Sequence, residues 1–180
     1  MNNLELQEYL NKKSEEIHAN NVAVGWWDGE QCIFTKMQLI STEIAEATEG
    51  VRKDLMDDHL PHRKMEEVEL ADALIRTLDL GGKMNLSVIL DGQPIDTVAD
   101  LLKAENRTVG FLHLVLNGSL LHFSEELDDE HYSILVAGLI SVALVRGYDI
   151  ISAMEEKLEY NKHRADHKKK NREKEGGKKF

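Results

Sequence analysis

The chain has 180 residues, of which 42% are hydrophobic and 31% are charged, as in an ordinary soluble globular protein. Its formal net charge of −11 argues against a general nucleic-acid binder, so we expect no DNA partner. No apolar run reaches the roughly 20 residues that a membrane-spanning helix needs, and the single cysteine, Cys32, excludes an internal disulfide framework. We therefore expect a cytoplasmic protein that does not enter a membrane.

The charge is unevenly distributed along the chain. From Lys162 to Phe180 there are nine Lys or Arg residues against three acids, a net of +6, so the preceding 161 residues carry −17. The last residues also lack the apolar periodicity of a helix. We therefore expect one domain over residues 1–165 and a basic, disordered tail over 166–180 that is solvated rather than bound to RNA.

Three helices are predicted in the first half of the chain, because apolar residues recur there every three or four positions. The pattern is clearest from Met37 to Val51 and from Met65 to Leu78. Gly81 and Gly82 are expected to end the third helix. The predicted helices span 3–19, 33–55 and 63–80, with a loop over 20–32.

The second half of the chain is also predicted to be helical. Residues 109–123 read as a buried helix, although the run from Val109 to Leu116 is compatible with a strand as well. Residues 129–147 form a nearly apolar helix, which one chain of this size would struggle to cover on every side; a homodimer or homotetramer would cover it. The other predicted helices are a short one over 97–104, capped by Asp96, and a last one from Asp149 to at least Arg164, supported by a capping-box pattern at Ser152–Glu155.

These elements predict an all-α fold, a bundle of four to five main helices. No βαβ alternation is present, which argues against a parallel sheet. The helices over 33–55 and 63–80 are joined by a short connection that contains Pro61, so we expect them to pack antiparallel. Dimerisation is expected to complete the bundle.

Four acidic residues lie on these two helices in apolar surroundings. Glu43 and Glu46 are spaced i, i+3, and so are Glu69 and Asp72, so each pair places two carboxylates on one helix face. An isolated pair of this kind is usually a solvated surface feature. Two pairs on successive antiparallel helices, both beside the apolar stripe, are harder to explain in that way, because an unpaired charge near a core is costly.

A divalent metal ion would offset the repulsion between the four carboxylates. Magnesium favours carboxylates, waters and substrate phosphate oxygens as ligands. Neither cysteine nor histidine lies among the four acids, which favours a hard cation over zinc. We expect a Mg²⁺ site, in which Mn²⁺ could substitute, that binds a polyphosphate and activates a water for attack on phosphorus.

The segments LISTEIAEATEG and EEVELADALIRTLDL resemble the paired helix motif of the all-α nucleoside triphosphate pyrophosphohydrolases, the MazG-like group. The motif is Glu-x-x-Glu, a variable spacer and Glu-x-x-Asp, and here 22 residues separate Glu46 from Glu69. The C-terminal GYDIISAMEEKLEYNKHR resembles the last helix of the family. The resemblance covers residues 33–82 well and 129–165 moderately.

This resemblance implies Mg²⁺-dependent cleavage of a nucleoside triphosphate between its α- and β-phosphates, giving a monophosphate and pyrophosphate. The biological role would be nucleotide-pool sanitation or control of dNTP levels. By the same resemblance, Glu43, Glu46, Glu69 and Asp72 would be the metal ligands. Glu46 would also be the catalytic residue that orients or deprotonates the attacking water.

Three candidate substrate-binding residues lie before the first acidic pair. Trp26 and Trp27 follow one another in the loop; one of them could stack on a nucleobase, or could instead anchor the loop to the core. Lys36 lies two turns before Glu43 on the same helix face and could reach a phosphate, or could remain solvated.

Three more candidates lie on the last helix. Lys157, Asn161 and Arg164 follow the pattern K-x-x-x-N-x-x-R, which matches the family, and share one helix face. They could bind the phosphates, or form a face of ordinary ion pairs. His59 and His62, in the connection before the second acidic pair, are expected to be solvated.

Two alternatives remain open from the sequence. One is a relative with a narrower substrate, such as dUTP, dCTP, phosphoribosyl-ATP or an alarmone nucleotide. The other is a helical interaction module without catalysis, whose acidic face binds a basic partner. Release of pyrophosphate that depends on Mg²⁺ would distinguish an enzyme from the module.

Overall fold

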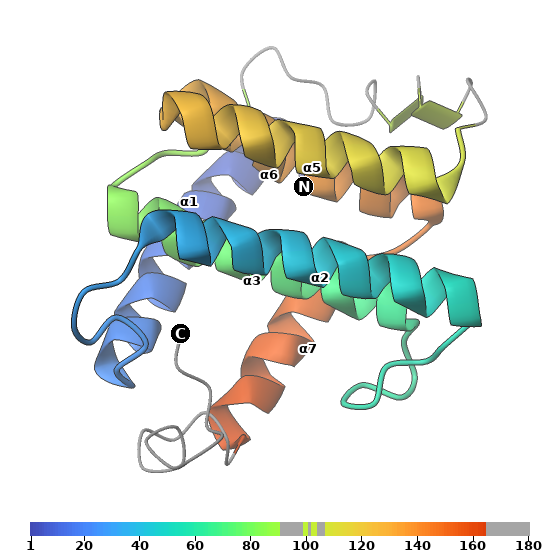
Figure 1. Cartoon of the computed structure of the whole chain (residues 1–180), viewed down its shortest axis with the longest axis horizontal. Helices are drawn as coiled ribbons and strands as arrows, with labels where there is room; N and C mark the ends of the chain where they lie inside the picture. The colour runs from blue at the N-terminus through green and yellow to red at the C-terminus, as the bar shows by residue number, and fades with distance from the viewer. Residues whose placement is uncertain (91–98, 101, 104–106, 165–180) are drawn as a thin grey trace.

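The computed structural model describes residues 1–90, 99–100, 102–103 and 107–164, and this part of the chain folds into a bundle of α-helices (Figure 1). Apart from one isolated bridge between Met56 and Lys64, no β-pairing occurs among these residues. The all-α prediction is confirmed, with six long helices in place of the expected four or five. They are α1 (Asn3–Ala23), α2 (Ile33–Lys53), α3 (Met65–Met84), α5 (Val109–Glu126), α6 (Asp129–Arg146) and α7 (Ile150–His163).

Helices α2 and α3 lie side by side and run in opposite directions at the centre of the bundle (Figure 1). Their apolar stripes meet, and Ile40, Ile44 and Leu74 are fully buried. The connection between them is held by Asp57, whose carboxylate accepts hydrogen bonds from the backbone N–H groups of His59 and Leu60. The predicted antiparallel pair of motif helices is therefore confirmed.

The expected end of α3 at Gly81 and Gly82 is wrong, because the helix continues to Met84. It ends where Asn85 adopts a left-handed conformation with φ of 56°. The glycines serve close packing instead. A Cβ on Gly81 would lie 2.2 Å from the hydroxyl oxygen of Tyr132, and one on Gly82 would lie 2.6 Å from Cβ of His18.

We expect Gly81→Ala to destabilise the protein by about 2–4 kcal/mol, because Tyr132 is fully buried and cannot move aside. Gly118→Ala is the matched control. Among the described residues nothing lies within 4 Å of a Cβ built there, so the better helix propensity of alanine should stabilise α5 by up to about 1 kcal/mol. Thermal unfolding of both variants checks this, and equal effects would contradict the packing role of Gly81.

Helices α5 and α6 stack above the α2–α3 pair, and α7 crosses beneath it (Figure 1). Helix α5 runs from Val109 to Glu126, so the helical reading of this segment is confirmed over the strand.

The capping box expected at Ser152 is wrong. Asp149 caps α7 by accepting a hydrogen bond from the backbone N–H of Ser152, because a carboxylate three positions earlier already fills that role. The short helix predicted over 97–104 and the tail over 166–180 lie largely outside the described residues.

Helix α6 is covered within a single chain, since most of its apolar residues pack against α3, α5 and α7. Several large apolar side chains remain exposed on α5, namely Phe111, Leu114, Val115 and Leu121. Within the described ranges, no single helix is long and apolar enough to cross a membrane; α6 and α7 together reach that length and composition, with a 108° bend between them.

Candidate metal centre

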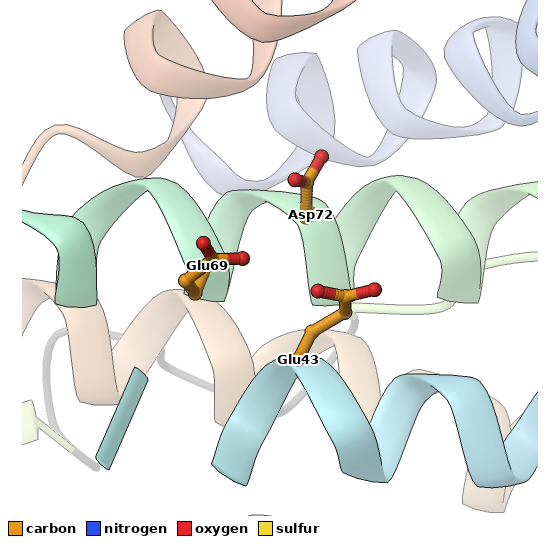
Figure 2. A group of neighbouring side chains, drawn as sticks. All are labelled: Glu43, Glu69 and Asp72. Carbon is orange, nitrogen blue, oxygen red and sulfur yellow. The ribbon is translucent and has the colours of Figure 1, made fainter. Parts of the chain in front are cut away.

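Two helices bring three of the four predicted acids together. Glu43 extends from α2, and Glu69 and Asp72 extend from successive turns of α3, so that their carboxyl groups gather beside α3 (Figure 2). One oxygen of each carboxyl lies within 4.8 Å of one oxygen of each of the others. Glu43 and Glu69 are each only 7% exposed, so these two members of the acidic triad are buried rather than part of the open surface.

The fourth predicted acid, Glu46, lies outside the triad. It follows Glu43 by one turn of α2 and is exposed to solvent. It still lines the same cavity as the three acids of the triad and is close enough to raise the pKa of Glu69. Its position is that of an accessible carboxylate at the edge of the triad.

Two cations of the chain itself contact the triad. Lys157 Nζ from α7 lies 3.0 Å from Asp72 Oδ2, and this lysine is only 1% exposed. Arg76 Nε lies 2.5 Å from Glu43 Oε1 and donates a hydrogen bond to it. Arg76 was not among the sequence candidates, although it follows Asp72 by one turn on the same face of α3. Its partner lies on another helix, which the sequence pattern does not indicate.

Glu69 is the least compensated member of the triad. Among the described residues, its carboxyl group forms no hydrogen bond or ion pair. Burial, together with the neighbouring Asp72 carboxyl, raises the pKa of Glu69 to about 9. Burial also raises the pKa of Asp72, although the ammonium group of Lys157 opposes this effect. The positive charges of the described chain therefore compensate the ionised triad only in part.

Lys157 also contacts a residue that sequence reasoning treated as solvated. Its Nζ lies 3.3 Å from His59 Nδ1, and the His59 ring stacks at a tilt on Tyr160 with ring centroids 4.7 Å apart. Burial, with the positive charges of Lys157 and Arg164, lowers the pKa of His59. The Asp57-capped turn therefore places the His59 imidazole against Lys157, which in turn contacts the triad.

One cavity of about 1330 Å³ borders the triad. All ten residues predicted from the sequence to bind metal or substrate line this cavity, although they come from three helices and a loop. Asn161 contributes a buried side-chain oxygen, Oδ1, that has no hydrogen-bond partner in the described structure. Such an atom at a cavity wall favours a polar ligand. The ten residues are Trp26, Trp27, Lys36, Glu43, Glu46, Glu69, Asp72, Lys157, Asn161 and Arg164.

The two tryptophans differ in their surroundings. Trp27 packs partly against the core, and its indole N–H donates a hydrogen bond to Asp79 Oδ1 at 2.9 Å. Lys36 donates to the backbone oxygen of Trp26 at 3.2 Å, and its ammonium group also lies 4.9 Å from the centre of the Trp27 ring. Trp27 is therefore an anchor, as in the second of the two readings of the loop, and Lys36 helps to hold the loop.

The donor set of the triad fits a hard divalent cation. All three groups offer carboxylate oxygens, which Mg²⁺ and Mn²⁺ prefer, whereas zinc sites in proteins are usually built with histidine or cysteine. Burial raises the pKa of both Glu69 and Asp72, so negative charge on these two carboxyl groups is poorly compensated by the rest of the described structure. In the search for similar proteins, no family model, curated protein or solved structure matches this chain.

Proposed function

We propose that this protein is a Mg²⁺-dependent nucleoside triphosphate pyrophosphohydrolase, which cleaves a (d)NTP between the α- and β-phosphates. The observation that carries the proposal is the acidic triad of Glu43, Glu69 and Asp72, set in the wall of a cavity that is large enough for a nucleotide. The resemblance of the two acid-bearing segments to the MazG-like group supports the same reaction. The compartment in which this occurs is proposed to be the cytoplasm.

The residues that line the cavity would have different roles according to their position. The triad would bind the metal ion, which supplies charge for the phosphate oxygens and lowers the pKa of a bound water. Lys157 and Asn161 on α7, and Arg164 directly after it, line the cavity and would bind phosphate oxygens, since the cavity needs cations and donors to accept a polyanion. Helix α1 and the following loop would enclose the remainder of the substrate.

The test is product identity. Purified protein is incubated with a panel of dNTPs and NTPs, with and without Mg²⁺, and the products are separated. We expect monophosphate and pyrophosphate in equal amounts, and no diphosphate. Stepwise release of inorganic phosphate would contradict the proposal, and a narrow response to one nucleotide would identify the more specific relative. A folded protein inert on all nucleotides, with no stabilisation by Mg²⁺, would favour the interaction module.

Glu46 is proposed to orient or deprotonate the attacking water. We expect Glu46→Gln to fold normally, because the side chain is exposed, and to lower kcat by about 100-fold or more. Stabilisation by Mg²⁺ should be retained, since the buried triad is unchanged. Assay of kcat and of Mg²⁺-dependent melting checks both statements, and full turnover by this variant would remove Glu46 from the role.

We also propose a homodimer, formed through the exposed apolar face of α5. Leu114 and Leu121 are 69% and 60% exposed, and no Asp, Glu, Lys or Arg occurs between Val109 and Ser124. An uncharged helix face on a chain with 31% charged residues suits a second copy of the same face around a two-fold axis.

Light scattering coupled to size exclusion tests the dimer. We expect Leu114→Glu to give a monomer while the wild type is a dimer or tetramer. Leu4→Glu is the matched control, because Leu4 is 58% exposed and lies on α1 rather than on α5. An oligomer that persists in Leu114→Glu would place the interface elsewhere.

A further inference from the structure

A second acidic side chain of α3, Asp79, lies outside the triad and is fully engaged by donors from another part of the chain. It follows Asp72 by two helical turns, about 10 Å along the same face of α3. Its side chain is only 14% exposed and lines the cavity. Because its oxygens are already engaged by these donors, Asp79 is not available as a further metal ligand. Its position in the cavity wall, two turns from the triad, indicates a different role.

Three side chains converge on the Asp79 carboxylate from the end of α1 and the loop that follows. The Trp27 indole N–H donates to Oδ1 at 2.9 Å, and the Asn21 amide N–H donates to Oδ2 at 2.8 Å. The His18 Nδ1 lies 2.9 Å from Oδ1, and the His18 ring meets Trp27 edge-on at 5.3 Å. Both carboxylate oxygens are thus used to fix one wall of the cavity.

The wall that Asp79 holds is a tight turn with aromatic content. Gly25 and Gly29 adopt left-handed conformations with φ of 80° and 73°, which lets the chain reverse around Trp26 and Trp27. Trp26 is half-buried and lines the cavity from this turn. An indole, the amide of Asn21 and apolar neighbours suit a flat heterocycle with polar edges.

We infer that Asp79 is a positioning residue for a nucleobase subsite formed by the 24–28 turn and the end of α1. The inference rests on the proposed function, because the triad binds the phosphate end of the same ligand. Asp79 acts through Trp27 and Asn21: it holds the turn in place before the base arrives, so that binding does not have to order it. The separation from the triad along α3 is one that a nucleoside can span.

The experiment compares Asp79→Asn with wild type in kinetics and in binding. Asparagine keeps the shape but replaces one acceptor oxygen by a donor, so in either orientation of the amide at least one of the three converging groups loses its acceptor. We expect KM for the best nucleoside triphosphate to rise roughly 10- to 100-fold while kcat changes less than about twofold. Inhibition by inorganic tripolyphosphate, which has no base, should be unchanged, as should stabilisation by Mg²⁺.

Two further variants make the test decisive. Trp27→Phe keeps an aromatic ring, although a smaller one, and removes a single donor, so it should show the same split between KM and kcat at smaller amplitude, even if Asp79→Asn folds poorly. Asp54→Asn is the control, since Asp54 is exposed, pairs with Lys64 at the surface and lies in a left-handed position that asparagine tolerates.

The failures of the two proposals can be separated. Two results would show that the positioning role is wrong while the proposed function stands, provided that wild type hydrolyses nucleotides. In one, Asp79→Asn has the same KM as wild type. In the other, Asp79→Asn loses kcat and tripolyphosphate inhibition in addition to its raised KM. If wild type hydrolyses nothing, tryptophan fluorescence titrated with nucleoside monophosphates still tests the subsite. Binding that Asp79→Asn weakens would support the subsite alone, and no binding to wild type would overturn both proposals.

Discussion

Glu69→Gln is expected to make the metal-free protein more stable and, at the same time, inactive. The reason is that Glu69 is 7% exposed, lies beside two other acids and forms no hydrogen bond or ion pair within the described structure. Glutamine has nearly the same shape and is neutral in the unfolded state as well, so its folding does not require uptake of a proton at pH 8. We expect a gain of roughly 1–3 kcal/mol in the free energy of unfolding at pH 8, measured without metal.

The same residue predicts a pH dependence of stability. Burial raises the pKa of Glu69 from 4.5 to about 9, so between these values the folded state holds a proton that the unfolded state has lost. The stability contributed by this group is complete below pH 4.5 and falls as the pH rises toward 9, by up to about 1.4 kcal/mol per pH unit. The metal-free wild type should therefore lose stability relative to Glu69→Gln over this range.

Magnesium is expected to reverse the trend, because a metal ion at the proposed site would bind the ionised carboxylate. Stabilisation of the wild type by Mg²⁺ should grow as the pH rises, with release of a proton on binding. Glu69→Gln should show little of this stabilisation and at least about 100-fold less activity. Chemical denaturation at several pH values, with and without Mg²⁺, checks the prediction.

Glu15→Gln provides the control, since it makes the same chemical change at an exposed position on α1. It should alter neither stability nor activity appreciably. A Glu69→Gln protein that is less stable than wild type without metal would mean that Glu69 makes a structural interaction that the fold does not show. Unchanged activity would remove Glu69 from the site.

The part of the site that could be predicted from the sequence is the part carried by helical spacing. Glu43, Glu69 and Asp72 lie beside continuous apolar stripes, so their helix faces and the antiparallel packing of α2 on α3 follow from periodicity alone. Lys157 followed from the resemblance of the last helix to the MazG-like group. In each case the signal lies within one helix or between two consecutive ones.

Contacts between distant segments could not be predicted in this way. Arg76 and Asp79 follow Asp72 by one and two turns, so helical spacing places them on the same face of α3. Their partners belong to other elements: Glu43 binds Arg76, whereas His18 and Trp27 bind Asp79. The role of Gly81 likewise depends on Tyr132, 51 positions later in the chain. The sequence pattern predicts a helix end at this glycine, which is a common role of glycine. The neighbouring residues in the sequence do not indicate which side chain packs against it.

Lys157→Met is expected to produce the largest loss of stability among substitutions at the site. The lysine is 1% exposed, and its ammonium group lies 3.0 Å from Asp72 Oδ2. Methionine fills most of the volume but leaves the buried acids without this cation. We expect a loss of about 3 kcal/mol without metal, equivalent to roughly 6–12 °C in Tm.

Added Mg²⁺ should restore part of that loss, because it brings positive charge to the same carboxylates. Activity should remain low even with saturating Mg²⁺, since the proposed phosphate contact of Lys157 is missing. A second readout is the titration of His59. Its pKa, which burial and the charge of Lys157 hold down, should rise in Lys157→Met, and NMR of the imidazole protons measures this directly.

Lys53→Met is the matched control, because Lys53 is exposed at the end of α2 and pairs with Glu49 at the surface, where an ion pair contributes little. If Lys157→Met melted like the control, the buried acids would have to be protonated in the metal-free protein without help from the lysine. If Mg²⁺ stabilised the variant no more than it stabilises Lys53→Met, the carboxylates released from Lys157 would not be metal ligands. The combination expected here, a large loss that Mg²⁺ partly reverses, requires that the lysine and the metal ion compensate the same negative charge.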